Sequence, residues 1–157
     1  SPRRWDTASV RRFMVAFGPL SSIFDILTFA VLFFFVCPAV AGGAWGALDA
    51  TGQALFVGTF QAGWFVESMW TQTLVVHLIR TEKTPFVGSC ASLPLVMLGS
   101  MGIAVATLLP ASALGATLDF CSLPVVFWGV LAAMVLGYAA IVSCMKKVYL
   151  SRNDSLL

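Results

Sequence analysis

The sequence predicts an all-α integral membrane protein, a four-helix bundle with both termini on the cytoplasmic side. Hydrophobic residues make up 59% of its 157 residues and charged residues only 10%, whereas a soluble domain carries about 25% charge. Four segments are long and apolar enough to cross a bilayer, which takes about 20 such residues in a helix. The nine Lys and Arg residues fall in three groups, and a four-span topology brings all three to one side.

Proline and linker composition set the limits of the four spans. Pro110 ends the third span, and Pro124 opens the fourth, because proline fits the first turn of a helix without losing a needed donor. Linkers 38–54 and 110–123 are rich in Gly and Ala and hold no Lys or Arg, whereas linker 80–85 is short and basic. The predicted spans are residues 13–37, 55–79, 90–109 and 124–145.

The basic residues orient the bundle. Because positive charge gathers at the cytoplasmic ends of membrane spans, we expect the termini and linker 80–85 to lie inside. The N-terminal segment alternates Arg with apolar residues at helical spacing, which is typical of an interfacial segment. We therefore expect its partners to be anionic lipid headgroups rather than nucleic acid. The basic residues are Arg3, Arg4, Arg11, Arg12, Arg80, Lys83, Lys146, Lys147 and Arg152.

Two carboxylates fall near the centres of the first two spans. Asp25 is close to the midpoint of the first and Glu67 to that of the second, so both are expected near the bilayer midplane. A central Asp costs about 3 kcal/mol on the insertion scale, which the apolar first span tolerates. The second span also carries Gln72 and His77 and is marginal alone, so we expect it to be buried among other helices. His77, close to the cytoplasmic end, is expected to be a packing or interfacial residue.

The carboxylates have a functional and a structural interpretation. Carboxylate and amide oxygens are ligands for hard cations, so Asp25, Glu67 and Gln72 are candidate metal-binding residues on a cation path. Alternatively, Asp25 accepts hydrogen bonds from Ser and Thr hydroxyls on its own helical face, or from a helix outside this chain, and holds the bundle together. A free-standing four-helix channel, carrier or regulatory subunit using Asp25 and Glu67 fits the first interpretation.

Small residues also repeat at helical spacing in the later spans. Gly129, Ala133 and Gly137 recur every four residues in the fourth span, and Gly102 and Ala106 do so in the third. Such repeats favour close helix packing in membranes, so we expect both to be helix contacts.

The four cysteines are expected to be small apolar residues of the bundle. Cys37, Cys90, Cys121 and Cys144 form no CxxC pair and no zinc-binding spacing. A disulfide is conceivable for Cys37 and Cys121, which the topology places at one membrane face, but it is not favoured. A membrane thiol oxidoreductase, which needs reactive pairs near one face, is therefore the weakest of the alternatives.

Several stretches resemble the C-terminal membrane region of bacterial magnesium-transporting P-type ATPases. The resemblance covers nearly the whole chain and is most specific in the first two spans, whereas "LGY" in the fourth is a weak match. The sequence has no pattern of a signal peptide, and the resemblance makes it a piece of a longer protein. The matching stretches are "RRWD", "RFMVAFGPLSSIFDILTF", "FQAGWFVESMWTQTLVVHLIRTEKTPF" and "SCASLPL".

The resemblance implies that the chain supplies helices seven to ten of a ten-helix pump in the inner (plasma) membrane. Such a full-length pump is an ATP-hydrolysing translocase that moves Mg²⁺ toward the cytoplasm, with Mg²⁺ also needed alongside ATP. The chain itself contains neither the "DKTG" nor the "TGES" loop of that chemistry, so alone it is not expected to be an enzyme. Its partners would be the bilayer and the remaining helices and cytoplasmic domains of the same pump.

The resemblance also bears on the candidate ligands. The family's main ion site lies among helices four to six. In related calcium pumps helix eight adds one acidic ligand, and Gln72 falls at that position, with Glu67 more than a turn away. Asp25 falls in helix seven, which supports helix five, so the resemblance favours a structural Asp25.

Overall fold

The fold was analysed in a computed structural model that describes residues 7–79 and 93–152. These residues form helices and turns, and no strand occurs among them. The predicted positions Arg3, Arg4, Arg80, Lys83 and Cys90 lie outside the described residues. The elements are α1 (Thr7–Val31), η1 (Leu32–Val36), α2 (Cys37–Ala41), η2 (Trp45–Ala47), α3 (Ala50–Ile79), α4 (Leu93–Leu108), η3 (Leu109–Ala111), α5 (Ala113–Thr117) and α6 (Val125–Arg152).

The first three elements form one long helix with a π-helical turn, η1, in it. The N–H of Cys37 bonds to the carbonyl of Leu32, five residues earlier. The widened turn directly precedes Pro38, which has no N–H to donate and whose ring crowds the carbonyl of the preceding turn. The helix ends at Gly42, which adopts a left-handed conformation with φ of 84°, as glycine readily does.

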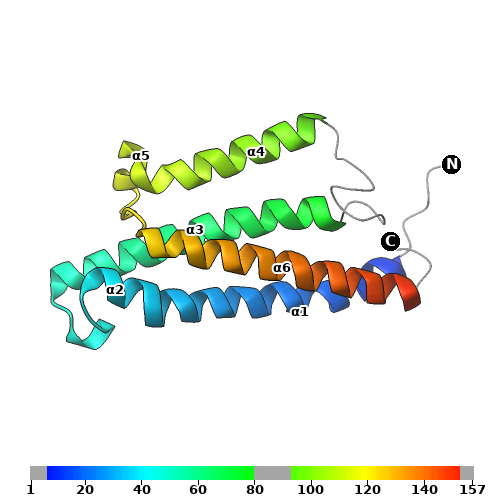
Figure 1. The fold of residues 1–157 in the computed structure, drawn as a ribbon, viewed down its shortest axis with the longest axis horizontal. Coiled ribbons are helices and arrows are strands. Elements are labelled where there is room, and N and C mark those ends of the chain that lie inside the picture. The colour runs from blue at the N-terminus through cyan, green and yellow to red at the C-terminus, as the bar shows by residue number, and fades with distance from the viewer. Residues whose placement is uncertain (1–6, 80–92, 153–157) are drawn as a thin grey trace.

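The helix α3 is the centre of the bundle. It packs against α1, α4 and α6, and α1 also contacts α6 (Figure 1). The helix α4 lies beside α3, on the side away from α1, and Trp70 Nε1 on α3 donates a hydrogen bond of 3.1 Å to Thr107 Oγ1 on α4. The polar second span is thus packed against three other helices and buries Glu67 among them, whereas Gln72 stays exposed in this chain.

The core is divided into two apolar clusters by a polar layer. The layer contains Thr28 of α1 and Glu67 and Thr71 of α3, all buried. It falls at mid-height in the bundle, because the clusters take α1 residues from either side of Thr28. One cluster is Leu32, Val36, Cys37, Phe56, Val66, Phe127 and Leu131, and the other is Phe17, Phe24, Leu78, Met134, Tyr138 and Val142.

Three described stretches are long and apolar enough to cross a membrane. They are Phe17–Ala47, Leu93–Ala111 and Val125–Tyr149. The helix α3 is outside this set although it has 30 residues. Its Gln, Glu and His side chains lower its hydropathy, as the marginal insertion balance of the second span predicts.

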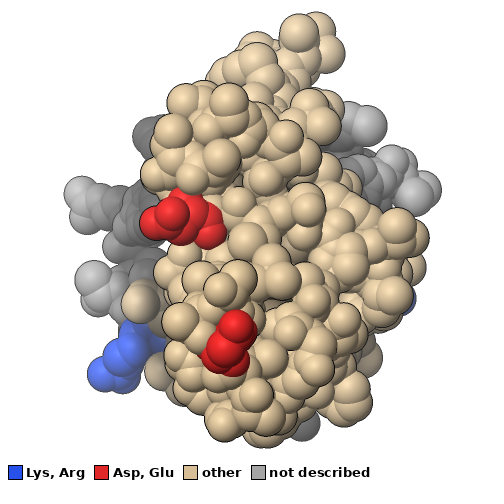
Figure 2. All heavy atoms as spheres, turned by 90° about the vertical axis from the view of Figure 1, so that its left-hand side faces the viewer, with Lys and Arg blue, Asp and Glu red and all other residues tan. Residues whose placement is uncertain are grey.

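The two ends of the bundle differ in charge. The helix α1 begins and α6 ends at the same end (Figure 1). The opposite end, where α2 and α5 lie, shows two acidic groups on its face, and Lys or Arg atoms are seen only at the edge of the view (Figure 2). Its connections contain Asp49 and Asp119 and no Lys or Arg. This asymmetry agrees with the grouping of basic residues in the sequence.

The small-residue repeat of α6 makes only part of the contact that its spacing predicts. Gly129 and Ala133 are exposed, and a Cβ built on Gly129 would meet no atom of another described helix within 4 Å. Gly137 is half-buried, and a Cβ built there would lie 3.9 Å from the Phe24 ring of α1. On α4, a Cβ on Gly102 would likewise meet no other helix of the described part, although Ala106 is buried. The prediction therefore holds at Gly137 and not at Gly129 and Ala133, where large side chains such as Phe127 and Leu131 form the packed face.

We predict that Gly58→Ala destabilises the bundle by about 1–3 kcal/mol, the usual cost of overpacking. A Cβ at Gly58 would lie 2.6 Å from the Asp119 carbonyl oxygen and 2.6 Å from Cys121 Sγ. It would push the connection before α6 away from α3. The thermal midpoint of the purified protein measures the effect. Gly129→Ala is the matched control, because it fills open space, and a normal midpoint for Gly58→Ala would contradict the close contact.

Candidate functional site

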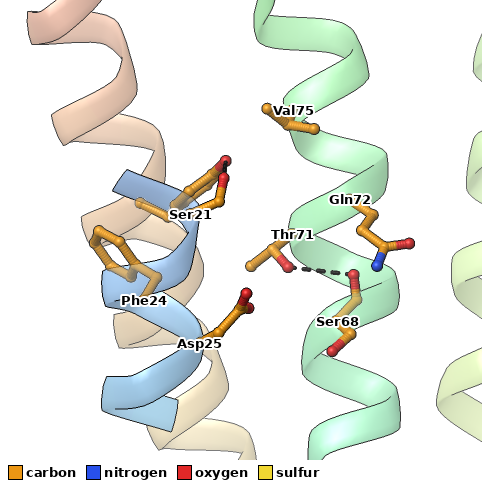
Figure 3. Close-up of a pocket in the computed structure, with 8 residues that line it drawn as sticks. Ser21, Phe24, Asp25, Ser68, Thr71, Gln72 and Val75 are labelled. Carbon is orange, nitrogen blue, oxygen red and sulfur yellow. Dashed lines mark hydrogen bonds between the residues drawn. The ribbon is translucent and has the colours of Figure 1, made fainter. Parts of the chain in front are cut away.

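The middle turns of α1 and α3 border a partly open cavity of about 160 Å³ (Figure 3). This is room for several waters. Most of the lining side chains are polar, and Asp25 is the one charged member. The lining residues are Ser21, Phe24 and Asp25 of α1, Ser68, Thr71, Gln72 and Val75 of α3, and Tyr138 of α6.

The structure brings two of the three predicted ligands to this cavity. Asp25 and Gln72 both line it and are both exposed in this chain. The Asp25 carboxylate points from α1 toward α3, where Thr71 faces it (Figure 3). The Thr71 hydroxyl donates to the backbone carbonyls of Glu67 and Ser68, at 3.1 and 3.2 Å, so its proton is directed along its own helix.

The third predicted ligand, Glu67, lies behind the cavity wall. It is 2% exposed and is not among the lining residues. Its Oε2 has no hydrogen-bond partner among the described residues, and neither has Thr28 Oγ1. Thr28 of α1 and Thr71 of α3 are the other buried polar residues of the layer. An unpartnered buried carboxyl oxygen is costly, so Glu67 is the most constrained polar group of the layer.

The helix α6 contributes a hydroxyl that the sequence reading did not identify. Tyr138 is 3% exposed, and its hydroxyl lies 2.9 Å from Ser21 Oγ in a hydrogen bond between α6 and α1. Its ring meets Phe24 edge-on, with centroids 5.1 Å apart. The available signal was Tyr138 itself, the one Tyr within the predicted span 124–145, because a buried phenol needs a partner.

The donor set decides what kind of cation would fit. Among the described residues, no group of three or more His, Cys, Asp and Glu side chains is arranged to hold a metal ion. One lining carboxylate with neutral hydroxyl and amide oxygens therefore suits a cation that keeps much of its water. Mg²⁺ behaves in this way, because it loses water reluctantly and binds through one or two carboxylates.

Two further polar residues lie where α3 ends. His77 Nδ1 is 2.8 Å from the Thr73 carbonyl oxygen, and Gly99 of α4 packs beside its ring, as expected for a packing histidine. Lys146 was expected among the cytoplasmic basic residues, yet it is 5% exposed and donates from Nζ to the Leu78 carbonyl at 3.0 Å.

The described cysteines form no pair. Cys37 is buried, Cys121 is half-buried and Cys144 is exposed, and all three are free thiols. Cys37 packs in an apolar cluster, in the role expected of a small apolar residue.

The fold and the polar layer define a class: an all-α, multi-pass membrane domain with a carboxyl-containing interior. Comparison with known proteins gives the family. Residues 2–148 match the family described as "Cation transporting ATPase, C-terminus". The chain belongs to this family, as the resemblance of its first two spans indicates.

Similar proteins agree with this membership. The chain is 39% identical over 151 residues to the protein "Magnesium-transporting ATPase, P-type 1" of Salmonella typhimurium strain LT2. It is equally similar to the protein of that name in Escherichia coli strain K12. Each match covers 96% of this chain and 15% of the relative. The chain thus spans about a sixth of the length of these relatives.

We predict that Tyr138→Phe and Ser21→Ala each lower the free energy of unfolding by about 0.5–1.5 kcal/mol, the worth of one hydrogen bond. Because both remove the same bond, the double variant should lose little more than either single variant. Thermal unfolding of the four proteins measures this cycle. Additive losses would show that the two hydroxyls do not interact.

Proposed function

We propose that this chain is the membrane-embedded supporting domain of an ATP-driven Mg²⁺ transporter, a P-type ATPase of the bacterial inner membrane. The family match over residues 2–148 is the observation that carries the proposal, and the names of the relatives supply the ion. In the full-length protein, Mg²⁺ is the cargo moved to the cytoplasm, and ATP hydrolysis takes place in parts that this chain does not contain.

The proposed topology has four spans with both ends cytoplasmic. The helix α3 is too polar to qualify by hydropathy, but it lies alongside α1, α4 and α6 (Figure 1). Its buried Glu67 and Thr71 face the layer with Thr28, whereas Gln72 is exposed in this chain. A helix packed in this way spans the membrane together with its neighbours, because polar groups are tolerated in a membrane when they face the bundle interior.

The exposed polar face of α1 and α3 supports the role of a supporting domain. Asp25, Ser22 and Gln72 are exposed at mid-helix, where a lipid-facing Asp costs about 3 kcal/mol. In the full-length protein this face is therefore covered by other helices of the pump that bring hydrogen-bond donors. Asp25 then holds the bundle against the ion-site helices.

A second candidate function is favoured by the cavity itself. A polar space with one carboxylate, beside the buried Glu67, is a fit for a partly hydrated cation. In this alternative, Asp25, Gln72 and Glu67 take part in a cation path, either in the pump or in a free-standing channel or carrier.

We predict that Asp25→Asn in the full-length protein preserves assembly and Mg²⁺ uptake, because Asn still accepts hydrogen bonds. Asp25→Leu should reduce the yield of folded protein, since it removes bonds worth about 1–3 kcal/mol. The measurements are size-exclusion yield and uptake into cells that lack other Mg²⁺ transporters. Ile26→Leu, at an exposed neighbouring position, is the control. Normal assembly of Asp25→Asn with abolished uptake would instead establish the cation path.

We predict that this chain alone, reconstituted in liposomes, passes no Mg²⁺ above the level of empty liposomes, as expected of a supporting domain. The assay is a Mg²⁺-sensitive dye enclosed in the vesicles. Flux that falls or rises with Glu67→Gln would overturn the supporting role and favour the channel or carrier.

A further inference from the structure

We propose that Lys146 is a positioning residue that fixes the register of α6 against α3 and thereby holds Tyr138 at the wall of the cavity. This role differs from the one expected for a cytoplasmic basic residue, which is contact with lipid headgroups. It also adds α6 to a site that the sequence assigns to α1 and α3 alone.

The geometry of Lys146 is that of a helix cap supplied by another helix. The last four carbonyls of a helix have no partner within it, and Leu78 is the penultimate residue of α3. Lys146 Nζ donates to this carbonyl at 3.0 Å from a side chain that is 5% exposed. The positive charge also meets the negative end of the α3 dipole. A buried ammonium group tolerates little displacement, because each lost bond leaves a charge unsatisfied.

The same register places the Tyr138 hydroxyl. Tyr138 precedes Lys146 by about two helical turns, roughly 12 Å, on α6. Leu78, Tyr138 and Phe24 belong to one apolar cluster between the two contacts. A shift of α6 by one turn would move Tyr138 by about 5.4 Å and break its 2.9 Å bond to Ser21. We therefore infer that the Lys146 bond at the end of α3, together with this cluster, keeps the Tyr138 hydroxyl at the cavity.

The neighbouring lysine offers a matched control. Lys147 is exposed and follows Lys146 directly, so the two differ in where the side chain lies rather than in charge or height. The helix continues to Arg152, and a displacement of these last turns would be transmitted to the cavity through Lys146.

The test is a double-mutant cycle of Lys146→Met and Tyr138→Phe in the full-length protein, read as thermal midpoints. Sites more than about 10 Å apart usually contribute additively. We expect the double variant to be no less stable than Lys146→Met alone, because that change already displaces the Tyr138 hydroxyl. Lys146→Arg should restore both the midpoint and the sensitivity to Tyr138→Phe, and Lys147→Met should match the wild type.

If the two single variants lowered the thermal midpoint by amounts that add up in the double variant, the proposal would be overturned, and Lys146 would only cap the end of α3. An equal loss in Lys147→Met, or no rescue by arginine, would also overturn it. If Lys146→Met does not fold, Lys146→Gln, which removes the charge and shortens the side chain but stays polar, replaces it in the same cycle. Thermal midpoints can be measured without any transport activity. An absence of Mg²⁺-dependent ATP hydrolysis would therefore contradict the proposed function without changing the outcome of this test.

Discussion

The buried carboxyl of Glu67 is the constraint on which the rest of the bundle depends. A carboxyl that faces lipid at the bilayer centre costs about 3 kcal/mol, so the side of the helix that carries Glu67 turns toward other helices. This requirement explains why α3 is central, with α1, α4 and α6 around it. It also explains why polar residues gather at one height, as Thr28 and Thr71 do beside Glu67.

Helix contacts in this chain combine large apolar side chains with a few directional bonds. In a bilayer the hydrophobic effect does little to join helices, so packing and hydrogen bonds decide the arrangement. Ser21 with Tyr138, Trp70 with Thr107, and Lys146 with the end of α3 each link a different pair of helices. Each bond fixes a relative height, which apolar packing alone specifies weakly.

The sequence predicted the fold class and the cavity residues Asp25 and Gln72 because hydropathy and helical spacing are local properties. The separate place of Glu67 behind the wall could not be predicted, since it depends on how α1 and α3 rotate against each other. The burial of Lys146 was missed for the same kind of reason, because a basic residue at the end of a span normally reaches the headgroups. The repeat that includes Gly129 shows a related limit. Residue spacing identifies a helix face suited to close packing, but it does not identify the helix that packs against this face.

The exposed and the buried carboxylates have different consequences for how this domain works in a longer protein. Glu67 is enclosed by helices of this chain, so its environment is already set within the domain. Asp25 is exposed, and its environment is completed by whatever covers the α1–α3 face. A movement of the covering helices would therefore change the surroundings of Asp25 while Glu67 stays fixed. Asp25 lines the same cavity as Thr71, whose hydroxyl bonds to the backbone carbonyl of Glu67. Such a movement would therefore act next to the polar layer, which gives a supporting domain a physical route to respond to the ion-site helices.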